Sequence, residues 1–303
     1  MLRPALNGIN LTVGAGEFVV LLGPSGCGKT TLVKMVNRLH DPTSGDILLD
    51  GQSIYAGMDV IALRRKIGYV IQQTGLFPHM TAAENIAVVP RLLKWPHEKI
   101  QPRVDELMEM VSLPPAEFRD RYPAQMSGGQ QQRVGVARAL AGDPGVILMD
   151  EPFGAIDAIT RAELQASLLQ LQRRLHKTIL FVTHDVEEAL RLADKIAILR
   201  DGDLVQTGSP LEILTQPKDA FIAQLVGADD TVRQLGLVRV EKVMAPLSGN
   251  LPPNLAHTIH LDQSLRLALS DLVKSNVDYL TVVNSKAEPV GTISFNDIRS
   301  AIG

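Results

Sequence analysis

A stretch of nine residues near the amino terminus combines three glycines, a lysine and two threonines. "GPSGCGKTT" (23–31) directly follows the apolar run "EFVVLL" (17–22), which has the character of a buried strand. The spacing G-x-x-x-x-G-K-[ST] places backbone N–H groups and a helix amino terminus around phosphate oxygens, with the lysine on the β and γ phosphates and the hydroxyl on Mg²⁺. The sequence therefore predicts a nucleotide-binding loop formed by Gly23, Pro24, Ser25, Gly26, Cys27, Gly28, Lys29, Thr30 and Thr31. Kinases, GTPases, helicases and transporter motors share such a loop, so it leaves the kind of protein open.

Polar side chains stand at the ends of three further apolar runs. "VILMD" ends in Asp150 and is followed by Glu151, "YVIQ" ends in Gln72, and "LFVTH" ends in His184. A carboxylate beside bound phosphates can hold the water shell of Mg²⁺ or accept a proton from an attacking water. Taken singly, Gln72 and His184 could each simply be a polar strand end, and the alternative for Asp150 and Glu151 is an acidic strand end beside a turn proline.

The elements that must position these residues alternate along the chain. Apolar runs bounded by turn residues predict five buried strands, at 17–23, 67–72, 145–152, 177–184 and 195–202. Apolar residues at three- and four-residue spacing predict helices at 28–39, 98–111, 128–141, 160–175 and 185–192. The alternation indicates an α/β fold in which helices cover a sheet.

Two regions depart from this alternation. Strand character is low between 73 and 140, where seven prolines occur, so we expect a helical insertion there. Around 227–241 small and charged residues interrupt the pattern. We therefore expect a large domain over 1–226, a linker over 227–241 and a small domain over 242–303.

Composition limits the classes of protein to which the chain can belong. Thirty basic and 33 acidic residues give a net charge of −3, so we expect no nucleic-acid partner. No apolar run approaches the roughly 20 residues that span a bilayer, and the first residues lack the pattern of a signal peptide. Cys27 is the one cysteine, which excludes an internal disulfide. We expect a globular protein of the cytosol, or one attached to a membrane through a partner.

A second motif indicates the kind of protein. "MSGGQQQR" (126–133) is separated by twelve residues from "VILMDEP" (146–152). The run "SGGQ" is the signature of the ATP-binding-cassette (ABC) family, and over 1–226 the chain resembles that family in the order and spacing of its motifs. The resemblance implies a P-loop NTPase fold, in which helices flank a mixed sheet and a helical subdomain is inserted. It also implies an ATPase that uses ATP and Mg²⁺.

The resemblance gives the polar strand ends their roles. Asp150 resembles the carboxylate that holds the magnesium water shell, and Glu151 resembles the general base for the attacking water. Gln72 resembles the glutamine that touches Mg²⁺ and water and moves with an attached permease, and His184 resembles the switch histidine on the γ phosphate. "GAID" (154–157) resembles the family's D-loop, with Ile156 where leucine is usual. The resemblance implies that the catalytic residues are Glu151, His184 and Gln72. It implies a metal site formed by Thr30, Gln72 and Asp150. It also adds Asp157 to the nucleotide site.

Family members bind two ATP molecules at the interface of a head-to-tail dimer. The resemblance therefore implies a homodimer in which the signature of one chain, at Ser127, Gly128, Gly129 and Gln130, faces residues 23–31 of its twin. The signature opens a predicted helix, so it offers a hydroxyl, backbone donors and the positive end of a dipole to the γ phosphate.

Three stretches resemble the ATPase subunits of bacterial importers for quaternary-amine osmoprotectants such as glycine betaine, choline and carnitine. They are "RRKIGYVIQQTGLFPHMTAAENI" (64–86), "LLKWP" (92–96) and "MDEPFGAIDAITR" (149–161). The resemblance implies a transmembrane permease as direct partner, a solute-binding protein as indirect partner, and a location on the cytoplasmic face of the inner membrane. The alternatives are an importer of another small solute and a soluble ABC ATPase outside transport. Soluble members usually carry two cassettes in one chain or a long coiled-coil insertion, and neither is found here.

The chain departs from the family at the adenine site. Relatives usually carry, ahead of the nucleotide-binding loop, an aromatic residue that stacks on adenine, whereas no aromatic residue precedes Phe18 here. Because stacking of a base on an aromatic ring contributes roughly 1 to 3 kcal/mol, we expect weaker ATP affinity than in a form that carries the aromatic segment.

The last part of the chain has a different character. "TIHLDQSLRLALSDLVKSNVDYLTVVNSKAEPVGTISFNDIRSAI" (258–302) predicts strand, helix, strand, turn, strand and helix, a small α+β domain. It resembles a cystathionine-β-synthase-type (CBS) domain, in which Ser294 and Asp297 match the positions that contact ribose and phosphate. We expect a purely structural pairing module, and a site for an adenine nucleotide is the alternative.

Overall fold

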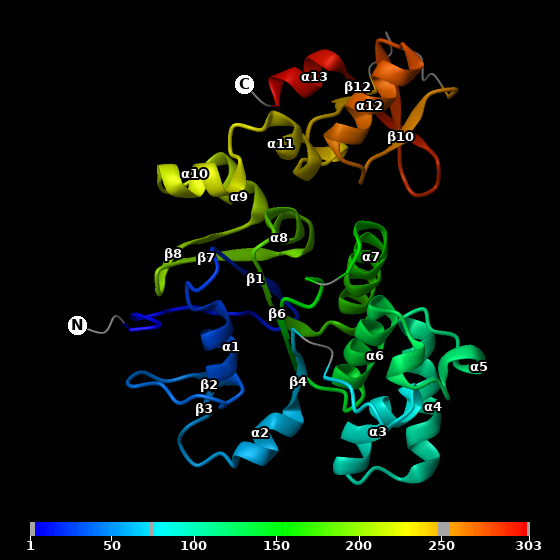
Figure 1. Ribbon diagram of the computed structural model, residues 1–303. Coiled ribbons are helices and arrows are strands. Elements are labelled where there is room, and N and C mark those ends of the chain that lie inside the picture. The colour runs from blue at the N-terminus through cyan, green and yellow to red at the C-terminus, as the bar shows by residue number, and fades with distance from the viewer. Residues whose placement is uncertain (1–3, 73–74, 155, 248–254, 302–303) are drawn as a thin grey trace. The chain divides into compact units, whose positions relative to one another are not determined.

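The computed structural model describes residues 4–72, 75–154, 156–247 and 255–301, and its elements are labelled in Figure 1. The chain divides between Thr207 and Gly208 into two compact units. Gln73 of the double glutamine after "YVI" and Ala155 of "GAID" lie outside the described residues.

A six-stranded sheet forms the centre of the first unit. Its order is β4-β5-β6-β1-β7-β8, and the first five strands in this order pair in parallel. A two-residue turn joins β7 to β8, which requires an antiparallel pair, so the sheet is mixed. The strands are β1 (Phe18–Leu22), β4 (Ile67–Val70), β5 (Val146–Asp150), β6 (Thr178–Thr183), β7 (Lys195–Arg200) and β8 (Asp203–Gly208).

Burial explains why the predicted strands are continuous apolar runs. All five residues of β1 are buried, as are the last five of β6, because helices cover both faces of a parallel sheet. The five strands predicted from sequence are confirmed, and β8 was not predicted. The core of this unit includes Val19, Leu21, Val33, Leu148 and Val182.

Helices and a small hairpin complete the first unit. The predicted helices are confirmed as α1 (Lys29–Val36), α4 (His97–Met110), α6 (Gly128–Leu140), α7 (Ala158–Leu175) and α8 (Val186–Leu192). In the described part of the predicted insertion every regular element is a helix: α3 (Ala82–Leu92), α5 (Pro115–Phe118) and the 3₁₀ helix η1 (Pro123–Gln125) occur besides α4 and α6, joined by loops. Figure 1 shows α3 to α6 gathered as one group of helices. The hairpin or loop signal of "DGQS" (50–53) falls at the turn between β2 (Leu48–Leu49) and β3 (Gln52–Ser53), whereas these two short strands, α2 (Val60–Lys66) and α3 were not predicted.

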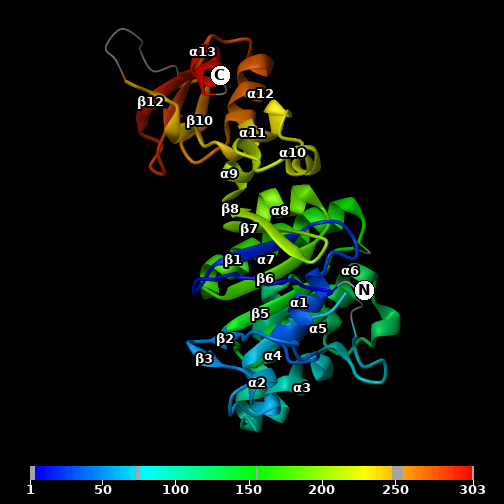
Figure 2. The same ribbon diagram turned by 90° about the vertical axis from the view of Figure 1, so that its left-hand side faces the viewer.

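The second unit holds a four-stranded sheet in the order β10-β11-β12-β9. Figure 2 shows its strands and helices from the side. The predicted order of elements is confirmed by β10 (Thr258–His260), α12 (Leu265–Ser275), β11 (Tyr279–Val283), β12 (Pro289–Ser294) and α13 (Phe295–Ser300). Four helices and a short strand were not predicted: α9 (Pro210–Thr215), α10 (Ala220–Val226), α11 (Thr231–Leu237), η2 (Val240–Lys242) and β9 (Ala245–Pro246).

The stretch 227–241, expected as a linker, contains α11 and the start of η2. Asp230 caps α11 by accepting hydrogen bonds from the backbone N–H groups of Val232 and Arg233. Leu235 and Val240 are buried in the core of the second unit. Burial of these two side chains packs residues 227–241 against the rest of the second unit, although the composition of this stretch is largely polar.

None of the helices in the described ranges combines the length and the apolar character that a membrane crossing requires.

Candidate active site

The sheet order brings the candidate residues to one edge. Strands β4, β5, β6 and β1 are consecutive parallel neighbours, so their carboxyl ends meet at the same edge, where open α/β sheets bind ligands. The chain leaves β4 toward Gln72, leaves β6 at His184 and leaves β1 into the loop 23–31. Asp150 is the last residue of β5. Four segments that are far apart in sequence therefore meet at this edge.

The loop 23–31 packs tightly against two other segments of the chain. Gly23 has φ 153°, and a Cβ there would lie 2.1 Å from the carbonyl oxygen of Leu199. Gly28, at φ 108°, precedes α1, and a Cβ there would lie 2.6 Å from the Leu6 side chain. No other residue type fits either position. The glycines are therefore required for the shape of the loop as well as for access to its N–H groups.

Lys29 points its ammonium group into this loop. Its Nζ donates hydrogen bonds to the carbonyl oxygens of Gly23, at 2.7 Å, and Pro24, at 2.9 Å, and the residue is only 4% exposed. A buried cation needs such acceptors. Phosphate oxygens would be stronger acceptors than these carbonyls because they carry charge.

Thr30 and Asp150 pair across 120 positions of sequence. The Thr30 hydroxyl donates to Asp150 Oδ1 at 2.8 Å. Burial raises the pKa of Asp150, and the nearby Glu151 charge adds to this, while the Thr30 hydrogen bond opposes it. A hydroxyl and a carboxylate side by side are the hard oxygen ligands that Mg²⁺ prefers. A divalent cation here would offset the unfavourable burial of the Asp150 charge.

Glu151 is the meeting point of the other two strand ends. Its Oε2 accepts a hydrogen bond from Gln72 Nε2 at 3.0 Å, and its Oε1 lies 3.4 Å from His184 Nδ1. The residue adopts φ 45°, a left-handed conformation that is unusual outside glycine. Its N–H donates to the Val182 carbonyl on β6 at 3.0 Å. The structure therefore brings all three predicted catalytic residues together.

The signature residues 127–130 begin α6 with a capping box. Ser127 Oγ accepts from the Gln130 N–H, and Gln130 Oε1 accepts from the Ser127 N–H at 2.9 Å. The two glycines differ: a Cβ on Gly129 would lie 2.7 Å from Thr160 Cγ2, whereas a Cβ on Gly128 would meet nothing within 4 Å. Gly129 thus packs against α7, and Gly128 presents a bare backbone surface.

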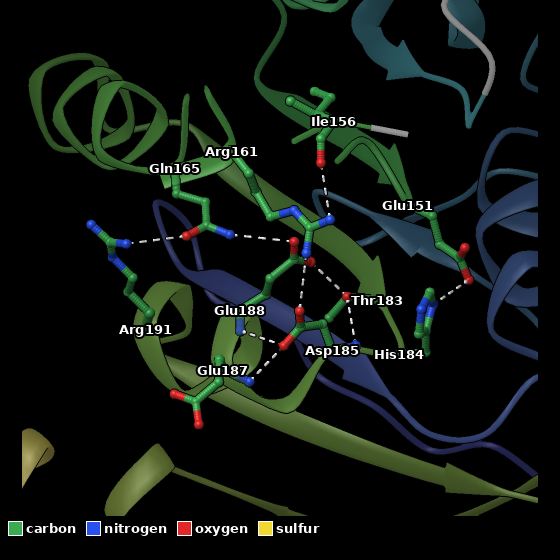
Figure 3. A network of polar contacts seen from close by, with 10 residues as sticks. All are labelled: Glu151, Ile156, Arg161, Gln165, Thr183, His184, Asp185, Glu187, Glu188 and Arg191. Carbon is green, nitrogen blue, oxygen red and sulfur yellow. Dashed lines mark hydrogen bonds and ion pairs between the residues drawn. The ribbon is translucent and has the colours of Figure 1, made fainter. Parts of the chain in front are cut away.

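Asp157 begins α7 and leads into a network that sequence reasoning missed. Asp157 Oδ1 accepts from the Thr160 N–H at 3.1 Å. Arg161, one turn further, reaches the Ile156 carbonyl and the Asp185 carboxylate, as Figure 3 shows. Behind them, buried Glu188 binds the Thr183 hydroxyl and the Gln165 amide. The one sequence signal was position: Arg161 follows "GAID" (154–157) closely, and Asp185 directly follows "LFVTH" (180–184).

These residues fit MgATP. The closed glycine loop, the inward ammonium of Lys29 and the N-terminus of α1 form a cradle for phosphate groups. The Thr30 and Asp150 pair supplies oxygen ligands for Mg²⁺. Glu151 supplies a carboxylate held by two neighbours beside this cradle.

Comparison with known proteins gives the family. The ABC transporter family model matches residues 6–154. "Choline transport ATP-binding protein OpuBA" of Bacillus subtilis is 49% identical over 286 residues, which cover 94% of this chain and 72% of the relative. "Glycine betaine/carnitine/choline transport ATP-binding protein OpuCA" of the same species is 50% identical over 283 residues, with coverage of 93% and 72%. The chain belongs to the ABC transporter ATP-binding proteins.

A solved structure agrees with this assignment. The dimeric structure of the ATP-binding cassette MJ0796, in a post-hydrolysis state bound to ADP and Pi, matches with a TM-score of 0.62 and 37% identity. The match covers 68% of this chain and 90% of that one. The chain is the ATPase subunit of an ABC importer, it uses ATP and Mg²⁺, and the predicted P-loop cassette fold is confirmed.

Proposed function

We propose that this ATPase drives uptake of quaternary-amine osmoprotectants through a transmembrane permease, with a solute-binding protein as an indirect partner. The observation that carries the substrate class is the near-50% identity, over more than nine-tenths of the chain, to proteins named for transport of choline, glycine betaine and carnitine. The same proposal locates the chain at the cytoplasmic face of the membrane, attached through the permease.

In ATP hydrolysis, each polar residue at the carboxyl edge of the sheet has its own role. Thr30 and Asp150 would hold Mg²⁺, with Gln72 as the third predicted ligand, and the ion would supply positive charge beside the phosphate oxygens. Glu151 accepts the proton of the attacking water at a carboxylate oxygen. Gln72 and His184 fix that carboxylate through its two oxygens, and His184, which is exposed on its other side, contacts the γ phosphate.

The working form is a homodimer with two nucleotides between its subunits. Ser127, Gly128, Gly129 and Gln130 of each chain complete the site built by residues 23–31 of the other. Three observations support this arrangement: the open backbone at Gly128, the exposed start of α7 at Asp157, and the dimeric state of the similar cassette.

The second unit regulates transport as a CBS-like domain. A pocket of about 520 Å³ lies beside the Ser294 and Asp297 capping box, with Tyr279 and Thr292 in its lining. This pocket is the candidate site for an adenine nucleotide, and a structural pairing role is the alternative. Deletion of 231–303 is expected to leave basal ATP hydrolysis within about twofold while changing the response of transport to osmotic stress and nucleotides. An unchanged response would reject the regulatory role.

Reconstitution tests the substrate class. The chain is co-expressed with a candidate permease and a candidate solute-binding protein, and ATP-dependent uptake of radiolabelled glycine betaine, choline and carnitine into vesicles is measured. Glycine is the matched control, because it keeps a carboxylate and lacks the quaternary ammonium. We expect saturable uptake of at least one quaternary amine and none of glycine. Uptake of another solute alone would replace this substrate class, and failure to co-purify with any permease would favour a soluble ATPase.

A further inference from the structure

The network beside the active site links the loop that carries Asp157 to the loop that carries His184 (Figure 3). Arg161, in the first turn of α7, connects the two. Its Nη2 donates to the carbonyl oxygen of Ile156 at 3.1 Å, and its Nη1 donates to Asp185 Oδ2 at 3.4 Å. One guanidinium group thus bridges the residue before Asp157 and the residue after His184.

Both neighbours of His184 are held in place by side-chain contacts. The Thr183 hydroxyl donates to Glu188 Oε2 at 2.6 Å and accepts from the Asp185 N–H at 2.9 Å. Asp185 Oδ1 caps α8 by accepting from the N–H groups of Glu187 and Glu188. The Asp185 carboxylate therefore has one oxygen on α8 and the other on Arg161, so the turn at His184 is fixed between α8 and α7.

The bridge is built for position more than for stability. The side chains of Arg161 and Asp185 are 32% and 33% exposed, and partly exposed ion pairs contribute little to stability. A planar guanidinium can bind two acceptors in a fixed direction, which a lysine ammonium does not do in the same way. Arg161 is bonded to the Ile156 carbonyl, so a shift of Ile156 would displace Arg161 and, with it, Asp185.

We infer that Arg161 is a positioning residue for ATP hydrolysis, which acts through Asp185 to hold His184 against Glu151 and couples this arrangement to the loop that carries Asp157. The inference rests on the catalytic role proposed above for His184. Within the described ranges, Arg161 forms no hydrogen bond or ion pair with Glu151 or with the loop 23–31. It acts through its two acceptors, the Ile156 carbonyl and the Asp185 carboxylate.

The test compares two lysine substitutions in the full-length chain. Arg161→Lys keeps the charge and loses the two-pronged bridge. Arg191→Lys is the matched control, since Arg191 contacts the same network only at Gln165 Oε1. The readouts are kcat and KM for ATP, the melting temperature, and the imidazole Cε1–H NMR signal of His184, which is assigned by its absence in His184→Ala.

We expect Arg161→Lys to lower kcat by about tenfold or more, as small misplacements of catalytic groups do, with KM within about twofold of the wild-type value. In Arg161→Lys the His184 signal should shift. In Arg191→Lys both kcat and the His184 signal should stay unchanged. Asp185→Asn, which keeps an oxygen to cap α8 and loses the charge facing Arg161, should reproduce the effect if Arg161→Lys folds poorly. A kcat within about twofold of wild type, or a lower kcat with an unmoved His184 signal, would overturn the inference. Full activity of His184→Ala would instead reject the role proposed for His184.

Discussion

Glu151 adopts a left-handed backbone conformation at the point where three strand ends converge. Such a conformation costs on the order of 1 kcal/mol or more in a non-glycine residue and persists where the surroundings hold it. Here the N–H bond to the Val182 carbonyl and the contacts of both carboxylate oxygens hold it. The geometry of a single residue thus depends on β4, β5 and β6 together.

The Thr30 hydroxyl bonds Asp150 and is proposed above as a ligand for Mg²⁺, so its removal should lower activity. In Thr30→Val the shape is kept and the hydroxyl is lost. We expect Mg²⁺-dependent ATPase activity to fall by at least about tenfold, since even outer-shell metal partners contribute roughly 10- to 100-fold. Thr30→Ser keeps the hydroxyl and should retain most of the activity. Magnesium titrations of the hydrolysis rate measure both variants, and equal rates for valine and serine would show that the hydroxyl has no such role.

Burial raises the pKa of Glu188, and the nearby Asp185 charge contributes. Because the folded pKa lies above the ordinary value of 4.5, the folded chain binds this proton more tightly than the unfolded chain does. The free energy of unfolding therefore falls as pH rises from about 4.5 through the raised pKa. Glu188→Gln removes this dependence and keeps an oxygen for the Thr183 hydroxyl.

Denaturant unfolding over about pH 5 to 8 checks the Glu188 prediction. We expect Glu188→Gln to be more stable than wild type at the upper end, with a difference that shrinks toward the lower end. Glu187→Gln, an exposed position on the same turn of α8, is the control. A difference that grows as the pH falls would contradict the assigned direction of the pKa shift.

At the scale of elements, two adjacent glycines at the start of α6 have different tasks. Gly129 packs against α7, and Gly128 exposes backbone that we expect to face a nucleotide. A Cβ on Gly129 would meet Thr160 at 2.7 Å, so Gly129→Ala should destabilise the fold by about 1 to 3 kcal/mol through overpacking. A Cβ on Gly128 meets nothing within 4 Å. Gly128→Ala should therefore leave the melting temperature nearly unchanged but strongly reduce ATPase activity, because the added methyl group blocks the surface offered to the other subunit's nucleotide. Normal activity of Gly128→Ala would argue against a composite site.

Sequence predicted the elements at this edge because their signals are local. The loop 23–31 carries its glycines and lysine in one run, and β1, β5 and β6 are continuous apolar stretches. The pairing of Thr30 with Asp150 was not derivable from either motif alone, since it depends on the strand order that places α1 beside the end of β5. The metal-binding role of Thr30 came from the loop motif, and that of Asp150 came from family resemblance.

Other elements escaped prediction for identifiable reasons. The N-cap of α3 at Thr81, with its reciprocal Glu84 contact, is a start signal that lay inside a stretch interrupted by prolines. Helix α11 has only seven residues, and Leu235 is its one buried side chain, so it shows little periodicity. The bridge at Arg161 joins two loops whose proximity follows from tertiary packing and has no local sequence pattern.

At the scale of the whole molecule, one chain forms the loop 23–31 and gathers Gln72, Glu151 and His184, while Ser127 and Gln130 bond to each other in the capping box of α6. The exposed backbone at Gly128 and the exposed Asp157 remain available to a second copy. A dimer with two nucleotides would use the exposed Gly128 backbone and the exposed Asp157 of both chains. The central claim is therefore that hydrolysis requires nucleotide held between two chains.

The sedimentation of Glu151→Gln with and without MgATP tests this claim most directly. Glutamine fills the same space but cannot accept the proton, so the nucleotide should stay bound and trap the dimer. We predict a monomer without nucleotide, a dimer with MgATP, no measurable turnover, and loss of the dimer when Gly128→Ala is added. A Glu151→Gln chain that hydrolyses ATP at the wild-type rate, or that stays monomeric with MgATP bound, would contradict the account.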